Sequence, residues 1–517
     1  MIDITDKYTS EQNIDLKIIN RTAMWNYIRL LWLSGLVLTM NYKARCEVVL
    51  PAIFSDGMVL QQQSKVPIWG KSDKKTVSVV TSWNNKKYNV SVNADGTWKV
   101  LLKTGKSGGA FTIKISDGGS ERNISNVLLG EVWLASGQSN MEMPLKGFKN
   151  APVNNSEEVI KKSSNANIRF FNVENKSWAK PLDDVSGQWL SVSPATASGF
   201  SAAAYFFALE LYKKMNVPVA IVESDWGGTV VQAWMSADDL KSFPEVQVKS
   251  FADSAYSFKN EPTGLYNAMI HPIAGYGIKG AIWYQGEQNR DEPTLYRKLF
   301  PAMVKQWRSE WGIGNFPFYY VQIAPYIYKD PNKLPEKLTK LKPFVPYLRE
   351  AQLQSETVIP NSGMAVLTDV GDESNIHPPD KETVGKRLSF IALAKTYGFK
   401  NIPYSGPVYK SMKIEGNTIL LAFENADGLY LKNNSSSNFE VAGSNKVFYP
   451  ATAVVEGQTV RVSSKQVANP VAARYAFDAW TVGDLFNKNQ LPASSFRTDD
   501  WNMEDVKQIP FASKETK

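Results

Sequence analysis

The hydrophobic pattern of the chain changes twice between residue 48 and its end. From there to about residue 126, short stretches such as residues 77–80 and 111–115 alternate apolar and polar positions. Turn-forming pairs such as Asn84-Asn85 separate these stretches. Alternation with a period of two in short, closely spaced segments predicts antiparallel strands. We therefore expect an N-terminal β-sandwich-type domain over residues 47–126.

From residue 127 to about residue 401, continuous apolar strands alternate with amphipathic helices. This order predicts an α/β domain, in which a mostly parallel sheet is covered by helices on both faces. The expected strands are residues 132–135, 219–222, 280–284, 318–323 and 364–367, and the expected helices are residues 201–215, 294–311 and 381–397.

Beyond residue 402 the alternating pattern returns. Residues 414–421 resemble a hairpin that turns at Gly416-Asn417. We expect a C-terminal β-rich domain over residues 402–517.

The first 46 residues differ from the rest. A short basic stretch follows Met24, and residues 30–38 are almost entirely apolar. This order is typical of a secretory signal, and the run is too short for a membrane span, which needs ~20 residues. We expect residues 1–46 to be a leader and secretion signal, with Met24 as the true start, and the mature protein to be periplasmic or extracellular without an integral membrane span. The alternative is a buried apolar helix.

Charge and composition narrow the function. The 517 residues include 58 basic and 50 acidic side chains, a net charge of +8 that is scattered along the chain. Because nucleic-acid binding concentrates positive charge, we expect no nucleic-acid partner. Cys46 is the single cysteine, and His271 and His377 are the only histidines. These counts argue against a disulfide scaffold and a zinc site, so we expect no metal and no cofactor.

Chemistry-bearing residues follow the ends of four predicted strands. Ser139 follows the first, Gly227-Gly228 the second, Asn289 the third and His377 the fifth. Ligands of open α/β sheets bind beyond the carboxyl ends of the strands, so these residues should lie together. A hydroxyl, a base and hydrogen-bond donors are what an acyl-transfer site needs. Taken one at a time, these residues also have structural interpretations. The glycines would form a tight turn, Asn289 would cap a helix, and His377 would be a buried, hydrogen-bonded side chain.

Four segments around these residues resemble the sialate O-acetylesterase family of SGNH hydrolases, as do residues 54–62 and 496–501. The resemblance implies a three-layer, flavodoxin-like central domain, with Ser139 as nucleophile and His377 as general base. The implied oxyanion donors are the backbone N–H groups of Ser139 and Gly228 and the side chain of Asn289, and the implied supporting residues are Gln138, Gly227, Glu287 and Asn375. The four segments are residues 137–141 (GQSNM), 226–229 (WGGT), 283–287 (WYQGE) and 376–378 (IHP).

The chain departs from this family in one place. SGNH enzymes usually carry an aspartate three residues before the histidine, where this sequence has Ser374. We expect Asp372 to orient His377, with Glu287, Asn375 or a backbone carbonyl as alternatives. His271 precedes the third strand, so we expect a structural role for it.

The resemblance thus predicts an exported serine esterase that hydrolyses O-acetyl esters on carbohydrates, with 9-O-acetyl sialic acid as the expected substrate. An acetylxylan or hemicellulose deacetylase would use the same residues. A carbohydrate-binding protein without catalysis is the alternative from another class. The sequence leaves the oligomeric state open.

Overall fold

The computed structural model describes residues 48–249, 258–328 and 344–508. The predicted leader and signal at residues 1–46 lie outside the described residues. No helix within these ranges is both long and apolar enough to cross a membrane.

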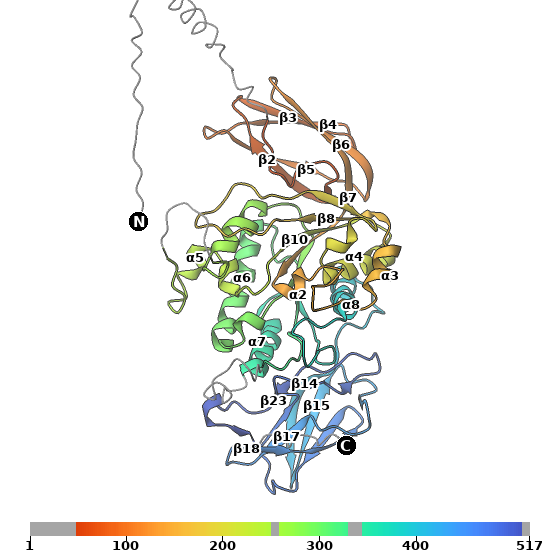
Figure 1. Ribbon diagram of the computed structural model, residues 1–517, viewed down its shortest axis with the longest axis vertical. Coiled ribbons are helices and arrows are strands. Elements are labelled where there is room, and N and C mark those ends of the chain that lie inside the picture. Colours follow the sequence, from red (N-terminus) through yellow and green to blue (C-terminus); the bar gives the residue numbers. More distant parts are fainter. Residues whose placement is uncertain (1–47, 250–257, 329–343, 509–517) are drawn as a thin grey trace, which may run out of the picture. The chain divides into compact units, whose positions relative to one another are not determined.

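A mixed sheet forms the centre of the fold (Figure 1). Neighbouring strands are parallel from one edge as far as β8, and β9 pairs antiparallel with β8. The α/β class predicted from strand–helix alternation is therefore confirmed. In spatial order the strands are β13 (Ser362–Ala365), β12 (Phe318–Val321), β11 (Gly280–Tyr284), β7 (Glu121–Gly137), β10 (Val219–Asp225), β8 (Asn165–Asn172) and β9 (Trp189–Val192).

Alternate side chains of the central strands enter two separate hydrophobic clusters. In β7, Val132 and Leu134 join one cluster, whereas Trp133 and Ala135 join the other. Helices α6 (Pro293–Trp311) and α7 (Phe344–Val358) contribute to the first, and α4 (Ala202–Met215) and α8 (Lys381–Ile391) to the second. The two helix pairs lie on opposite sides of the sheet (Figure 1). Burial on both faces explains why these strands are continuously apolar.

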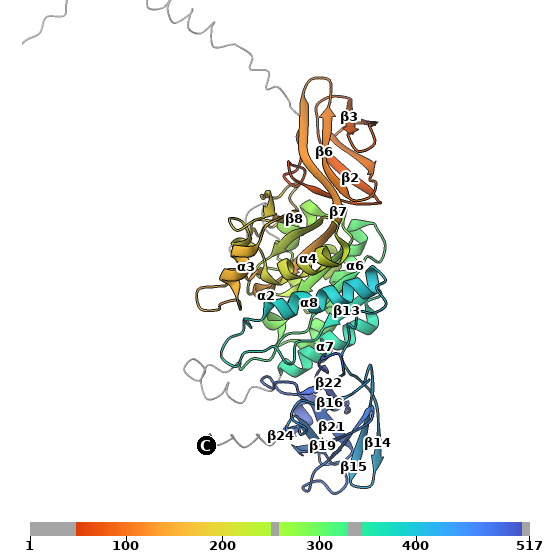
Figure 2. The same cartoon turned by 90° about the vertical axis from the view of Figure 1, so that its right-hand side faces the viewer.

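Strand β7 is shared between the central sheet and an N-terminal region of mostly antiparallel strands (Figure 2). Its first half pairs with β6 and β1, and its second half pairs with β10 and β11. One strand therefore crosses the predicted boundary at residues 126–127. The other N-terminal strands are β1 (Val59–Gln61), β2 (Lys65–Lys71), β3 (Thr76–Thr81), β4 (Lys86–Ser91), β5 (Thr97–Lys103) and β6 (Gly108–Ser116).

The C-terminal region contains two main sheets, antiparallel except where β24 pairs parallel with β18, and both sheets contribute to one hydrophobic cluster. The hairpin predicted at residues 414–421 is formed by β14 and β15, and Gly416 adopts a φ of +59° in its turn. The strands are β14 (Val408–Glu415), β15 (Thr418–Glu424), β20 (Thr459–Ser463) and β19 (Thr452–Glu456) in one sheet; β23 (Phe496–Arg497), β21 (Ala472–Tyr475), β17 (Phe439–Ala442), β18 (Val447–Pro450) and β24 (Lys507–Gln508) in the other; and β16 (Tyr430–Leu431) with β22 (Leu485–Phe486).

Short helical turns connect these elements. They are α2 (Ser139–Glu142), α3 (Ser156–Lys162), α5 (Ala237–Leu240), η1 (Ala197–Gly199), η2 (Val231–Trp234), η3 (Tyr266–Ile270), η4 (His271–Ile273), η5 (Glu287–Asn289), η6 (Ala392–Thr396) and η7 (Met503–Asp505). Of these, α2 and η5 begin just beyond the carboxyl ends of β7 and β11.

Candidate active site

Ser139 is placed by the turn at the end of the central strand β7. Gly137 has a φ of +143°, and a Cβ atom there would lie 2.2 Å from the carbonyl oxygen of Tyr284. Only glycine fits this close approach to β11. The backbone N–H of Gln138 donates to the same carbonyl at 2.9 Å, and Ser139 begins α2. The nucleophile candidate therefore stands at the carboxyl edge of the sheet.

His377 reaches Ser139 from a loop 238 residues further along the chain. Its Nε2 lies 2.9 Å from the Ser139 Oγ, within hydrogen-bond distance. The ring of Phe148 packs edge-on against the imidazole, with 5.2 Å between ring centroids. Burial, assisted by the charge of Lys381, lowers the pKa of His377 to about 4. At neutral pH the imidazole is therefore uncharged and can accept the serine proton.

Asp372 is not brought to this imidazole. Its Oδ1 accepts hydrogen bonds from the backbone N–H and hydroxyl of Ser374 and from the backbone N–H of Asn375, at 2.8–3.0 Å. Among the described residues, no hydrogen bond joins this carboxylate to His377. The Asn375 Oδ1 accepts from the backbone N–H of His377 at 2.9 Å. Asp372 and Asn375 thus shape the turn before the histidine, because a short Asp side chain readily binds backbone N–H groups just ahead of it.

The glycine pair Gly227-Gly228 packs against Ser139. The Gly227 N–H donates to the Glu142 Oε2 at 2.7 Å, and a Cβ at Gly227 would lie 3.0 Å from the Ser139 Cβ. Gly228 has a φ of +71°, and its N–H makes no backbone hydrogen bond in the described part of the chain. An unpaired backbone N–H beside a serine is what an oxyanion donor requires.

Asn289 lies in η5, just beyond the end of β11, and is 1% exposed. Its Oδ1 accepts from the Val231 N–H at 2.9 Å and the Gln285 Nε2 at 2.7 Å. These bonds fix the amide, and its Nδ2 donates to the Gln232 Oε1 at 3.1 Å, which leaves a second N–H. The helix cap that sequence reasoning offered as the alternative is not formed, because Glu292 is the N-cap of α6.

Gln138 ties the nucleophile turn to the loop after β11. Its Oε1 accepts from the backbone N–H groups of Gly286 and Gln288, at 3.3 and 3.2 Å. The side chain is 3% exposed. The two neighbouring strand ends are thereby held together.

A buried group, here called the Lys381 cluster, contains Lys381, Asn140 and Glu287. The Lys381 Nζ donates to the Asn140 Oδ1 at 2.5 Å, and the Asn140 Nδ2 donates to the Glu287 Oε1 at 2.6 Å. Burial lowers the pKa of Lys381 to about 7 and raises that of Glu287. Sequence reasoning missed Lys381, although it shares a helical stripe with the buried residues Val384, Leu388 and Ile391.

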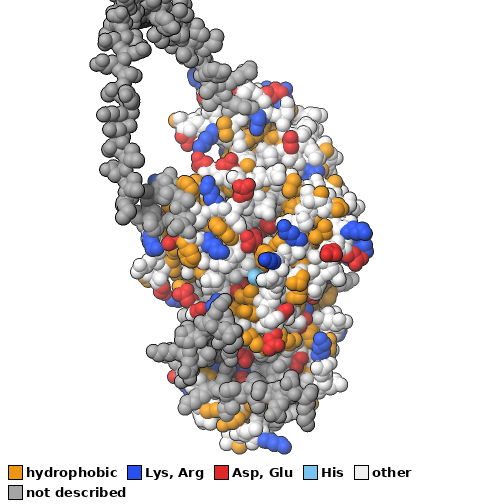
Figure 3. All heavy atoms as spheres, in the orientation of Figure 1, with side chains coloured by type: hydrophobic (Ala, Val, Ile, Leu, Met, Phe, Trp, Pro, Cys, Tyr) orange, Lys and Arg blue, Asp and Glu red, His pale blue; other side chains and the backbone are white. Residues whose placement is uncertain are grey.

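A second group, here called the acidic cluster, contains Glu142, Glu223 and Asp225. All three line an open pocket of about 360 Å³ that also includes Phe148, which contacts His377. Burial and mutual repulsion raise the pKa of Asp225 and raise that of Glu223 to about 8. Glu142 belongs to α2, which begins at Ser139, so this pocket adjoins the serine. On the face in Figure 3, a histidine ring reaches the surface among acidic, basic and hydrophobic side chains.

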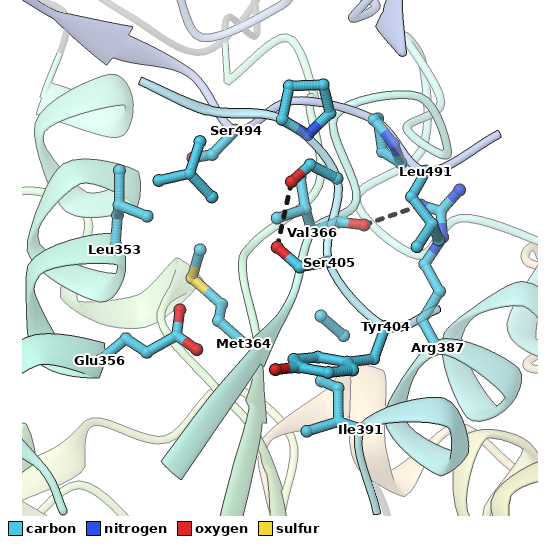
Figure 4. A pocket seen from close by; sticks show the side chains of 15 residues that line it. Leu353, Glu356, Met364, Val366, Arg387, Ile391, Tyr404, Ser405, Leu491 and Ser494 are labelled. Carbon is cyan, nitrogen blue, oxygen red and sulfur yellow. Dashed lines mark hydrogen bonds between the residues drawn. The ribbon is translucent and has the colours of Figure 1, made fainter. Parts of the chain in front are cut away.

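A smaller cavity of about 30 Å³ lies away from these residues (Figure 4). Glu356, Met364, Arg387, Tyr404 and Ser405 contribute to its lining. Ser139, Asn289 and His377 do not line it.

His271 lies elsewhere, in η4 before β11. Its ring packs edge-on against Tyr266, with 5.8 Å between centroids. In the described ranges, no group of histidine, cysteine, aspartate and glutamate side chains is arranged to hold a metal ion. His377 is therefore the histidine that the fold brings to Ser139.

Comparison with known proteins covers most of the chain. Residues 129–389 match the family model described as carbohydrate esterase, sialic acid-specific acetylesterase. Mouse sialate O-acetylesterase is 30% identical, with 74% of this chain and 80% of the mouse protein covered. The human enzyme is 28% identical, with 82% and 87% covered. The crystal structure of a carbohydrate acetylesterase from Xanthomonas citri is 36% identical with a TM-score of 0.78, covering 88% of this chain and 100% of that one.

Proposed function

Because the chain belongs to the sialic acid-specific acetylesterase family of carbohydrate esterases, and is thus a carboxylic ester hydrolase, we propose that it removes O-acetyl groups from carbohydrates through an acyl-enzyme on Ser139. The contact of 2.9 Å between the Ser139 Oγ and the His377 Nε2 carries this proposal. A hydroxyl beside an uncharged imidazole is an activated nucleophile.

The reaction follows from this geometry. His377 takes the hydroxyl proton as the Ser139 Oγ attacks the acetyl carbonyl carbon. The backbone N–H groups of Ser139 and Gly228 and the side chain of Asn289 then stabilise the oxyanion. The C–O bond to the sugar breaks, and His377 returns the proton to the sugar oxygen. Water, deprotonated by His377, then attacks the acetyl-serine carbonyl; the bond to the Ser139 Oγ breaks, acetate leaves, and His377 returns the proton to Oγ.

The substrate proposed first is 9-O-acetyl sialic acid, with support from the names of the curated relatives. The acidic cluster favours a second candidate, an acetylated neutral sugar such as those in xylan and other hemicelluloses. Carboxyl groups accept hydrogen bonds from sugar hydroxyls, whereas a nearby anionic carboxylate would repel the carboxylate of sialic acid. The carboxylate in question is that of Glu174, which lines the same pocket and is exposed.

Parallel assays test the chemistry and the substrate. Ser139→Ala and His377→Ala should each reduce acetate release by several powers of ten, because such residues act as a unit. His271→Ala is the matched control and should keep its activity. Normal turnover by Ser139→Ala would reject the proposal. With O-acetyl sialic acid and acetylated xylan compared side by side, Glu174→Lys should shift the ratio of kcat/KM values toward the sialic acid.

We also propose that the enzyme is exported, and the basic stretch after Met24 followed by the apolar run at residues 30–38 supports this. Mass spectrometry of the mature N-terminus tests it. A chain that begins after Cys46 and is found outside the cytoplasm is expected, and an intact N-terminus on cytoplasmic protein would contradict it.

A further inference from the structure

Burying the charged groups of the Lys381 cluster costs free energy of folding, and the cluster has no role in the reaction described above. Lys381 is fully buried, and its ammonium donates to a neutral amide oxygen rather than directly to a carboxylate. Glu287 is 3% exposed, and its Oε2 has no hydrogen-bond partner. Replacing buried ion pairs by apolar residues often stabilises a protein. Stability therefore does not explain why a lysine occupies this place.

The contacts of the cluster point to the catalytic pair. Asn140 directly follows Ser139, and its Nδ2 donates to the backbone carbonyl of Ile376, the residue before His377, at 3.0 Å. Lys381 lies four residues after His377, at the start of α8. Glu287 belongs to η5, the turn that contains Asn289. One buried amide therefore joins the nucleophile turn, the histidine loop and the segment after β11.

We propose that the Lys381 cluster takes the place of the orienting aspartate: Asn140, held between Lys381 and Glu287, fixes the His377 loop against Ser139, and the cluster brings a cation to this loop where the family carries an anion. This inference rests on the proposed function of Ser139 and His377. Lys381, Asn140 and Glu287 are positioning residues in this scheme, since none of them exchanges a proton with the substrate.

The sign of the electrostatic effect is opposite to that of an aspartate. A carboxylate beside a histidine favours imidazolium, whereas an ammonium disfavours it. Burial and Lys381 both lower the pKa of His377, and Glu287 and Asp380 in turn favour the charged form of Lys381. Arg290 in turn favours the charged form of Glu287 and so lowers its pKa. The other titratable groups on the surrounding segments are Glu142, Lys146, Lys149, Asp372 and Glu373.

This arrangement has a functional consequence. An imidazole paired with aspartate gains a proton, and stops acting as a base, as the pH falls through its raised pKa. With Lys381 protonated nearby, His377 stays a base down to a pH near its lowered pKa of about 4. We therefore expect kcat/KM to hold its plateau well into the acidic range.

The decisive variant is Lys381→Gln, which keeps a donor for Asn140 but removes the charge. The acidic limb of kcat/KM on p-nitrophenyl acetate should move to higher pH by about one unit, because a cation near the imidazole is lost. The value of kcat should fall by ~10-fold, as expected when a catalytic group is less precisely placed. Glu287→Gln should leave the limb in place or lower it. Lys386→Gln is the matched control, since Lys386 lies on the same helix and pairs with Glu382 in solvent.

Direct titration of the imidazole separates this inference from the proposed function. With two histidines in the chain, His271→Ala leaves His377 as the single imidazole signal in an NMR titration. Its midpoint should rise in Lys381→Gln, and an unchanged midpoint and pH profile would overturn the inference, whatever Ser139→Ala does to activity. If Lys381→Gln does not fold, the double variant K381Q/E287Q removes both buried charges, and it should show the same rise.

Discussion

Two clusters of mostly buried polar side chains flank Ser139, and they differ in how they accommodate ionisable groups away from water. The Lys381 cluster contains a cation and an anion that an amide bridges, so its charges compensate each other. The acidic cluster contains three carboxyl groups on one pocket wall, and the pKa values of Glu223 and Asp225 rise, so that these groups take up protons. In the Lys381 cluster, opposite charges joined through an amide fix the positions of the side chains. In the acidic cluster, protonated carboxyl groups keep the pocket wall polar without a permanent charge. The first suits the proposed catalytic pair of Ser139 and His377, and the second suits the proposed role of the pocket in binding sugar hydroxyls.

The largest difference between the two groups should appear in stability. At pH 6, Glu287→Gln leaves a buried ammonium without its anion and should lower the free energy of unfolding by ~3–5 kcal/mol. Glu223→Gln replaces a carboxyl group that must take up a proton on folding at this pH, so the variant should lose no stability and should gain up to ~2 kcal/mol. Urea denaturation of the two variants beside the wild type measures both. Equal losses would mean that the two groups are not distinguished by compensation.

The proposed oxyanion donors come from both sides of this comparison, since Asn289 shares η5 with Glu287 and Gly228 follows the glycine held by Glu142. Asn289→Ala should lower kcat by ~10²–10³-fold with little change in KM, because the donor binds charge that develops only in the transition state. Steady-state kinetics on p-nitrophenyl acetate measures this. A loss confined to KM would make Asn289 a substrate-binding residue instead.

The acidic cluster should also give stability a pH dependence. Folding raises the pKa of Glu223 from ~4.3 to about 8, so between these values the folded state holds a proton that the unfolded state has released. Stability therefore falls as the pH rises through this window, by about 1 kcal/mol per pH unit for this group. Glu223→Gln lacks the effect, so its advantage over the wild type should grow from pH 5 to pH 8. A constant difference between the two proteins would show that Glu223 is already ionised.

The smallest effect is expected at Asp372. Its carboxylate closes a turn and does not contact the imidazole, so Asp372→Asn should leave the acidic limb of kcat/KM where it is and lower kcat less than about fivefold. The pH profile of this variant beside that of Lys381→Gln is the measurement. A shift to lower pH in Asp372→Asn would restore Asp372 as the partner of His377.

Local patterns predicted the central fold well. The apolar run at residues 219–222 lies in β10, and the periodic segment at residues 294–311 forms α6, because both burial patterns depend on near neighbours in sequence. The helix α7 was missed. The continuity of β7 across a predicted domain boundary was missed as well, because strand pairing joins residues that are distant in sequence.

At the site, strand ends and motifs predicted that Ser139 and His377 would meet, and the fold brings them together. Asp372 was expected because the family's aspartate position holds Ser374 and Asp372 is a nearby carboxylate in the same loop, but proximity in sequence does not determine where a carboxylate points in a turn. Lys381 was missed for a related reason. A lysine is usually solvated, and its burial depends on Asn140 and Glu287, which come from two other parts of the chain.

The seventeen-residue strand β7 also has a consequence for how the protein folds. Strand β6 precedes it in the chain and provides an edge on which its first half can form before β10 and β11 have been synthesised. The N-terminal strands thus act as a template for the central strand. Heating should melt the N-terminal strands and the Ser139 turn in a single transition, because neither can lose β7 without the other.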